Sequence, residues 1–187
     1  MEKPVMKTTP QLRGNDFQRN AFCSVWENFN LLRGRIMGAD LYIKTMPRDA
    51  QYRGFEVSID AVEVGYFRDA YNGWGLFAVM SHTLRKEMSW WKIANNRKEL
   101  FEECPNEGLV MTSEGVKQFW AEMQLIVRRF IKKKTYYRGE YQGRGKPFKR
   151  IQIRKQDDIK AIREHAELFA RFHILACELC SPVIWSV

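Results

Sequence analysis

Apolar residues recur three and four positions apart along much of the chain, the spacing of a helix that buries one face. The longest such stretches predict four helices: Phe17 to Leu32, a point after Gly73 to about Ala94, about Ser113 to Lys133, and Asp157 or Asp158 to a point before Pro182. A short helix is also predicted from about Asn96 to Glu103, because Pro105 disfavours a helix further on.

Shorter stretches alternate between apolar and polar residues, as strands with one buried face do. A hairpin is predicted over residues 40–60, with Pro47 to Asp49 in its turn. The segment 61–71 fits a strand or a helix equally well. Phe148 to Arg154 predicts a further strand with Ile151 and Ile153 facing inward, and the three glycines of residues 135–147 predict a flexible loop.

These elements predict an α+β fold: a helix-dominated single domain of about four to five helices with a small antiparallel β-sheet. Residues 1–14, with two prolines and no periodicity, are expected to form an extended or flexible arm, and residues 15–187 one globular domain. A chain of 187 residues that is 45% hydrophobic is long enough to bury a substantial core.

The composition excludes some classes of protein. No uncharged run reaches the length of a membrane span, and the N-terminus lacks the apolar stretch of a secretory signal. Four cysteines are too few for a disulfide scaffold of this size. We therefore expect an intracellular protein that is cytoplasmic, or nuclear in a eukaryote, and does not bind a membrane.

The net charge of +9 is concentrated in one place. Residues 128–155 contain twelve lysines and arginines and a single acid, Glu140, so that 19 basic and 21 acidic residues remain for the rest of the chain. A run of charges is usually a solvated surface, but a local excess of eleven positive charges in one short stretch is more than such a surface needs. The segment instead predicts a basic loop and strand that bind a polyanion.

Nucleic acid fits this segment best, since lysine and arginine bind phosphates, glycines allow close backbone approach, and tyrosines stack on unpaired bases. The predicted binding residues are Arg128, Lys132, Lys133, Tyr136, Tyr137, Arg138, Tyr141, Arg144, Lys146, Lys149, Arg150 and Arg154. Single-stranded or structured nucleic acid is favoured, with RNA and DNA both open. The three tyrosines fit packing as well as stacking.

An alternative is a small accessory subunit or inhibitor, of the kind that phages and mobile elements encode. Such a protein would bind an acidic protein surface or the nucleic-acid channel of a nucleoprotein complex. The predicted 73–94 helix has apolar residues on two faces, and it would contribute Val79, Trp90 and Ile93 from the second face, together with Trp91, to the interface. If this helix lies between other core elements, the same residues are simply buried, which is the more usual situation.

Catalytic readings are weaker. A metal-dependent nuclease, the second alternative, would use acids such as Asp49, Glu56 and Asp60, but the Glu-x-Lys element of one nuclease class is missing after Asp49. No phosphate-binding glycine loop or dinucleotide fingerprint is present. We therefore expect no catalytic residue, metal or cofactor.

The histidines and cysteines of the last helix also fit a structural role. His173, Cys177 and Cys180 lie along one side of this helix, but a zinc site needs a fourth ligand and more than one segment, so buried thiols are favoured. His165 lies on the apolar face and is expected to be a core residue with one or two hydrogen bonds.

Overall fold

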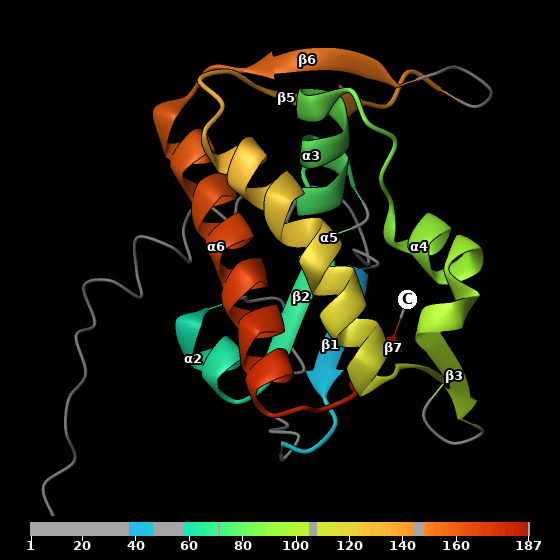
Figure 1. Cartoon of the computed structure of the whole chain (residues 1–187). Helices are drawn as coiled ribbons and strands as arrows, with labels where there is room; N and C mark the ends of the chain where they lie inside the picture. The colour runs from blue at the N-terminus through green and yellow to red at the C-terminus, as the bar shows by residue number, and fades with distance from the viewer. Residues whose placement is uncertain (1–37, 47–57, 71, 105–107, 144–147, 187) are drawn as a thin grey trace, which may run out of the picture. The chain divides into compact units, whose positions relative to one another are not determined.

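The computed structural model of the protein describes residues 38–46, 58–70, 72–104, 108–143 and 148–186 (Figure 1). The described residues all belong to one compact unit. The predicted arm (1–14), the predicted first helix (17–32) and most of the predicted 40–60 hairpin lie outside the described residues.

In chain order the described elements are β1 (Gly38–Ile43), α2 (Ile59–Glu63), β2 (Tyr66–Ala70), α3 (Leu76–Leu84), α4 (Trp90–Asn96), η2 (Lys98–Leu100), β3 (Phe101–Cys104), β4 (Gly108–Met111), α5 (Ser113–Ile131), β5 (Tyr136–Glu140), β6 (Lys149–Ile153), α6 (Gln156–Glu178) and β7 (Val183–Ser186).

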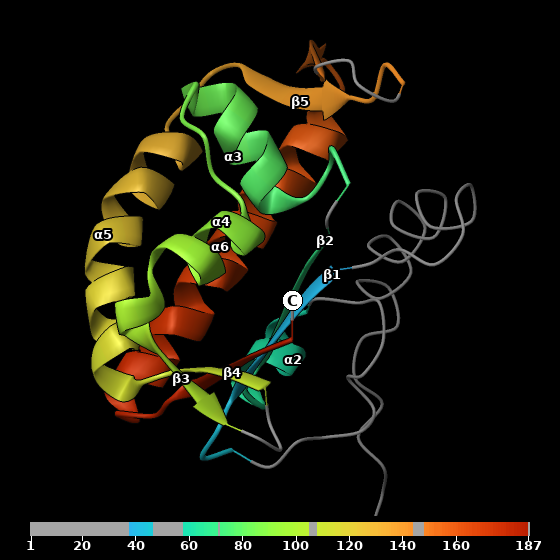
Figure 2. The same ribbon diagram turned by 90° about the vertical axis from the view of Figure 1, so that its right-hand side faces the viewer.

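The larger of two antiparallel sheets has the strand order β2-β1-β7-β4-β3, and β5 and β6 form the smaller one. Helices α5 and α6 pack against each other and lie on one side of the larger sheet (Figures 1 and 2). The predicted α+β class, helix-dominated with antiparallel sheets, is therefore confirmed.

Aromatic side chains fill the space between the sheet and the helices. Phe169 of α6 lies within 6 Å of the ring centroids of Phe67, Phe77 and Trp90. Trp90 in turn makes an edge contact of 5.0 Å with Trp185 of β7. These rings are almost completely removed from solvent, and aromatic side chains of this size contribute strongly to core stability.

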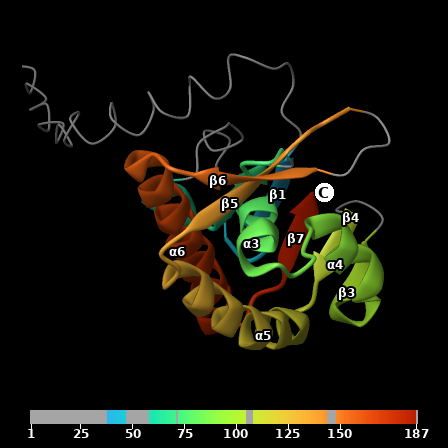
Figure 3. The same cartoon turned by 90° about the horizontal axis from the view of Figure 1, so that it is seen from above.

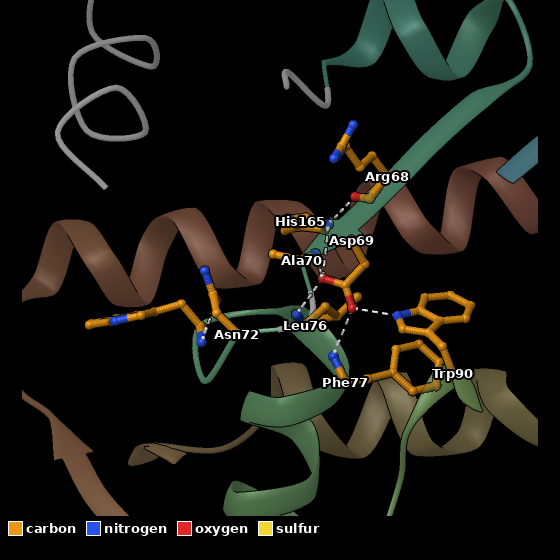
Figure 4. Close-up of polar contacts among 9 residues, drawn as sticks. Arg68, Asp69, Ala70, Asn72, Leu76, Phe77, Trp90 and His165 are labelled. Carbon is orange, nitrogen blue, oxygen red and sulfur yellow. Dashed lines mark hydrogen bonds and ion pairs between the residues drawn. The ribbon is translucent and has the colours of Figure 1, made fainter. Parts of the chain in front are cut away.

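A buried carboxylate fixes the start of α3 (Figure 4). The N-cap residue of this helix, Gly75, has no side chain to accept from its first backbone amides. Asp69, at the end of β2, accepts instead from Leu76 N at 2.6 Å and from Phe77 N at 3.2 Å. The partial positive charge of the helix N-terminus stabilises a carboxylate at this position.

The single helix predicted over 73–94 is wrong, because the chain turns between α3 and α4. Arg85 adopts a left-handed conformation with φ 53°, and Ser89 then caps α4 by accepting from Lys92 N at 3.1 Å. In a continuous helix Val79 and Trp90 would lie opposite the Phe77 face. The turn reorients α4 so that Trp90 is buried in the core, where Val79 of α3 is buried as well.

Other predictions between residues 59 and 111 need correction. The ambiguous segment 61–71 contains the end of α2 and then β2, and Ile59, predicted as a strand residue, begins α2. The predicted helix at 96–103 is a single 3-10 turn, η2, followed by β3. β1 pairs with β2 and β7. In its predicted partner strand at 55–60, residues 59 and 60 belong to the helix α2 and not to a strand.

The C-terminal half agrees better with the prediction. Thr112 caps α5 by accepting from Gly115 N at 2.9 Å, as expected. β6 lies within the predicted strand, with Ile153 buried. α6 ends before Pro182, although its N-cap is Lys155, and Asp157 and Asp158 lie in the first turn. The predicted loop 135–147 is wrong for residues 136–140, which form β5.

Candidate nucleic-acid interface

The basic segment contains the β5–β6 hairpin, which connects the end of α5 to the start of α6 and crosses α3 (Figure 3). The outer edge of β5 is joined to α3 through Thr83. Tyr137 N donates to Thr83 Oγ1 at 3.0 Å, and the threonine hydroxyl lies 3.3 Å from Tyr137 O. This contact through the β5 backbone holds the hairpin against α3, and the side chains of the hairpin are left to form a surface.

Tyr136 has no access to a ligand, which contradicts its predicted stacking role. It is fully buried, and its hydroxyl lies 3.1 Å from Phe130 O and 3.0 Å from Ile131 O. Arg163 of α6 donates to this phenol oxygen at 2.9 Å and to Lys133 O at 3.0 Å. Tyr136 therefore connects the end of α5 to α6, a packing role that a tyrosine in a basic segment also fits.

Tyr137 and Arg150 interact across the hairpin. The guanidinium of Arg150 lies over the Tyr137 ring at 3.3 Å, and its Nε donates to His82 O at 2.8 Å. Arg150 as a whole is still exposed. Tyr137 is thus covered on one side, and Arg150 is held in place by an aromatic ring and a carbonyl before any ligand binds.

His82 lies against Gly139 of β5, so that a Cβ at residue 139 would overlap the imidazole. Removal from solvent, and then the charge of Arg150, lower the pKa of His82 below its ordinary value. The loop before α3 is equally close on another side, since a Cβ at Gly73 would overlap Gly139 O. With His82 in place, glycine at 139 lets the hairpin lie this close to α3 without overlap.

Arg138 is engaged within the protein. Its guanidinium lies over Trp74 at 4.7 Å and forms an ion pair of 3.4 Å with Glu140. The single acid of the segment is therefore neutralised by a neighbouring base. The carboxylate then opposes an approaching phosphate less than a lone carboxylate would.

Several predicted cations do face solvent. Lys132 at the end of α5, Lys149 in β6 and Arg154 before α6 are exposed, and none forms an ion pair with a described residue. Lys149 and Arg154 are about 16 Å apart along an extended chain, a length over which one DNA strand carries about five phosphates.

The remaining predicted residues lie elsewhere or are less accessible. Lys133 is half-buried. Arg128 lies on a groove of about 300 Å³ between α5 and α6, together with Arg171 and Glu167. Arg144 and Lys146 lie outside the described residues.

Tyr141 and Phe148 form an exposed aromatic pair where the two strands of the hairpin end. Their side chains are 58% and 56% exposed, and their ring centroids are 5.9 Å apart at an interplanar angle of 56°. Tyr141 directly follows Glu140 and Phe148 directly precedes Lys149, the last residue pair of the two strands. Tyr141 was among the predicted residues. Phe148 was assigned to a strand without a binding role, although its position beside Lys149 and Arg150 was readable in the sequence.

The predicted partner interface is not one surface. Val79 and Trp90 are buried, so neither is available to a partner, whereas Trp91 is 65% exposed and Ile93 half-buried. The usual reading of the second helix face, burial in the core, is correct for Val79 and Trp90.

The buried polar centre of the protein is structural. Besides the amides of α3, Asp69 accepts from Ala70 N at 2.9 Å and from Trp90 Nε1 at 2.7 Å (Figure 4). His165 is buried and its Nε2 donates to Arg68 O at 3.0 Å, as expected of a core histidine. Burial lowers the pKa of His165, which lies 3.9 Å from Asp69. Neither side chain is accessible to a substrate.

Within the described ranges no three His, Cys, Asp or Glu side chains come together as a metal site would require. Asp60 is exposed at the start of α2, and the other acids of the nuclease reading, Asp49 and Glu56, lie outside those ranges. Cys177 is half-buried and Cys180 exposed, so the predicted burial of both thiols is wrong for Cys180. Burial raises the pKa of the Cys177 thiol.

Comparisons of the chain with models of protein families, with curated proteins and with solved structures found no match. In the described part of the chain, none of the helices is both long and apolar enough to cross a membrane.

Proposed function

We propose that this protein is a non-catalytic nucleic-acid-binding protein and that the β5–β6 hairpin, with the adjoining ends of α5 and α6, forms its binding surface. The observation that carries the proposal is the set of exposed cations at this end of the unit that have no acidic partner among the described residues. Lys132, Lys149 and Arg154 belong to this set. An exposed, unpaired lysine or arginine can replace the counterions that are condensed on nucleic-acid phosphates. The release of these counterions drives binding.

The hairpin is also arranged before binding. Arg150 is held by Tyr137 and His82, and β5 is joined to α3 by Thr83. Ordering a flexible loop would cost conformational entropy on binding, so a fixed scaffold favours affinity. The acids nearest to the hairpin in sequence also have partners of their own, which limits their repulsion of a phosphate. Glu140 is paired with Arg138, and Asp157 and Asp158 lie in the first turn of α6, where they complement the helix dipole.

The test is fluorescence anisotropy of the full chain with labelled single-stranded and duplex DNA and RNA, at several salt concentrations. We expect the logarithm of affinity to fall linearly with the logarithm of salt concentration. The double reversal Lys132→Glu with Lys149→Glu should weaken binding by about tenfold or more at low salt, because two phosphate contacts become repulsive.

The matched control is Lys98→Glu with Lys117→Glu, which changes the net charge equally. Lys117 is about 22 Å along α5 from Lys132, and both control lysines are exposed. Equal losses for the two double variants would mean that net charge alone, and not this surface, governs binding. Absence of binding to all four nucleic acids at low salt would refute the proposal.

A second candidate function is an accessory subunit that binds another protein, and it is favoured by Trp91. This side chain is 65% exposed at the start of α4, and tryptophan is enriched at protein interfaces. Copurification of a fixed partner from nuclease-treated cells of the source, lost with Trp91→Ala and retained with Lys149→Glu, would support it.

A further inference from the structure

The aromatic pair Tyr141 and Phe148 is unlike the other aromatic side chains of the hairpin and the core. Tyr136 is buried and Tyr137 is covered by Arg150. Tyr141 and Phe148 instead leave more than half of their surface in water while contacting each other. Single exposed apolar residues are ordinary, but two rings in contact on a charged hairpin form an apolar patch that a partner can cover.

The rings are inclined by 56° and already touch, so a planar ligand cannot enter between them. It can stack on an outer ring face, as bases do on aromatic side chains of proteins that bind single strands. In a duplex the bases are stacked on each other and their faces are not available. The geometry therefore distinguishes paired from unpaired bases.

Charge next to the pair favours the same ligand. Lys149 and Arg150 follow Phe148 directly and are exposed. The acid opposite Lys149, Glu140, forms its ion pair with Arg138. A phosphate on one side of a stacked base thus meets a cation within one or two residues of the ring.

We infer that Tyr141 and Phe148 stack on unpaired nucleobases, so that the hairpin prefers single-stranded nucleic acid to duplexes and to polyanions without bases. This inference rests on the proposed nucleic-acid-binding function and gives it a ligand class. Cations alone would bind all polyanions of similar charge density, whereas the aromatic pair adds a contribution that requires a free base face.

The experiment compares the wild-type full chain with the double variant Tyr141→Ala, Phe148→Ala. The ligands are labelled oligothymidylate of about 15 nucleotides, a length in the range that single-strand sites occupy, a duplex of the same length, inorganic polyphosphate as competitor, and phosphatidylserine vesicles. Loss of stacking is expected to weaken oligothymidylate binding by about tenfold or more. Duplex and polyphosphate binding should change less than about twofold, because the cations remain.

Trp91→Ala is the matched control, since it removes an exposed aromatic side chain from α4. It should leave all affinities unchanged. Thermal unfolding should be similar for all three proteins because the removed rings are exposed. Lys149→Gln serves as a charge control and should weaken binding to oligothymidylate, duplex and polyphosphate alike.

Three results would overturn the inference while the proposed function stands: unchanged oligothymidylate binding by the double variant, an equal loss for duplex and polyphosphate, or wild-type affinity that is no greater for the single strand than for the duplex. Vesicle binding that is lost with the aromatic pair, without any binding of oligothymidylate, would assign the pair to a lipid surface. Failure of the wild-type protein to bind any nucleic acid would refute the proposed function and the inference together.

Discussion

The indole Nε1 of Trp90 donates a hydrogen bond of 2.7 Å to Oδ2 of Asp69, a carboxylate that is fully buried. This bond joins the start of α4 to the end of β2. The same carboxylate accepts from the first amides of α3. One side chain therefore fixes three elements that are separate in the sequence.

Asp69→Ala is expected to destabilise the protein by about 3–5 kcal/mol, because it leaves several buried donors without an acceptor. Trp90→Phe should cost less than Asp69→Ala, since it removes one of these hydrogen bonds and part of the ring. Urea denaturation gives both free energies of unfolding. In the Asp69→Ala background, Trp90→Phe should cost less than it does alone, and strict additivity would contradict the direct coupling of the two side chains.

Tyr136→Phe tests whether this residue packs or binds. The variant keeps the buried ring but removes the hydroxyl to which Arg163 donates. We expect a loss of about 1–2 kcal/mol in the free energy of unfolding, because the arginine loses a partner in a part-buried position. Nucleic-acid affinity, measured well below the midpoint of unfolding, should not change. A specific loss of affinity at unchanged stability would restore the stacking role that the sequence suggested.

Gly139→Ala should destabilise the contact between the hairpin and α3 by about 1–3 kcal/mol, because the added methyl overlaps the His82 imidazole. The three heavy atoms nearest to a Cβ at this position all belong to His82. The double variant His82→Ala, Gly139→Ala should therefore lose much less than the sum of the single variants. Thermal or urea unfolding of the four proteins provides the cycle, and the absence of rescue would contradict the contact.

We expect His173 to make the free energy of unfolding sensitive to acid. Burial lowers the pKa of this histidine from 6.5 to about 4, its Nδ1 donates to Phe169 O at 2.9 Å, and its Nε2 has no partner among the described residues. The unfolded chain therefore binds the proton more tightly. The stability that the neutral ring contributes is full above pH 6.5 and declines as the pH falls toward 4, by about 3 kcal/mol in total.

His173→Phe removes this titration and keeps an aromatic ring next to Trp120 and Phe169, which His173 contacts. The free energy of unfolding of the variant should decline less between pH 6.5 and 4 than that of the wild type. His165 remains in both proteins and contributes with the same sign, since burial also lowers its pKa. Parallel pH profiles would show that His173 is already protonated in the fold or reached by water.

Local signals account for the elements that the sequence predicted. α5 has an apolar face at helical spacing and a threonine at its cap, and β6 has isoleucines at alternate positions. Both kinds of evidence lie within the element itself. The fold class and the concentration of positive charge follow from such patterns, and so does the exposure of Arg150 and Gln152 on the solvent side of β6.

Contacts between distant residues account for the errors. α3 is capped by Asp69, which belongs to a strand, and the turn at Arg85 uses a left-handed conformation that arginine seldom adopts. Gly139 was interpreted as a sign of a flexible loop, but it is required by His82, a residue of α3. Tyrosine is amphipathic, so no pattern within 128–155 distinguishes the buried Tyr136 from the exposed Tyr141.

The central position of β7 affects the order in which the protein can fold during synthesis. β7 is the last described element, yet it joins the β1–β2 pair to the β4–β3 pair. A ribosome that has translated the chain through α6 has therefore produced two strand pairs whose inner edges still lack a partner. Until Ser186 leaves the exit tunnel, β1 and β4 expose backbone groups that a second nascent chain can pair with. Slow translation between α6 and β7 would prolong this state and increase aggregation.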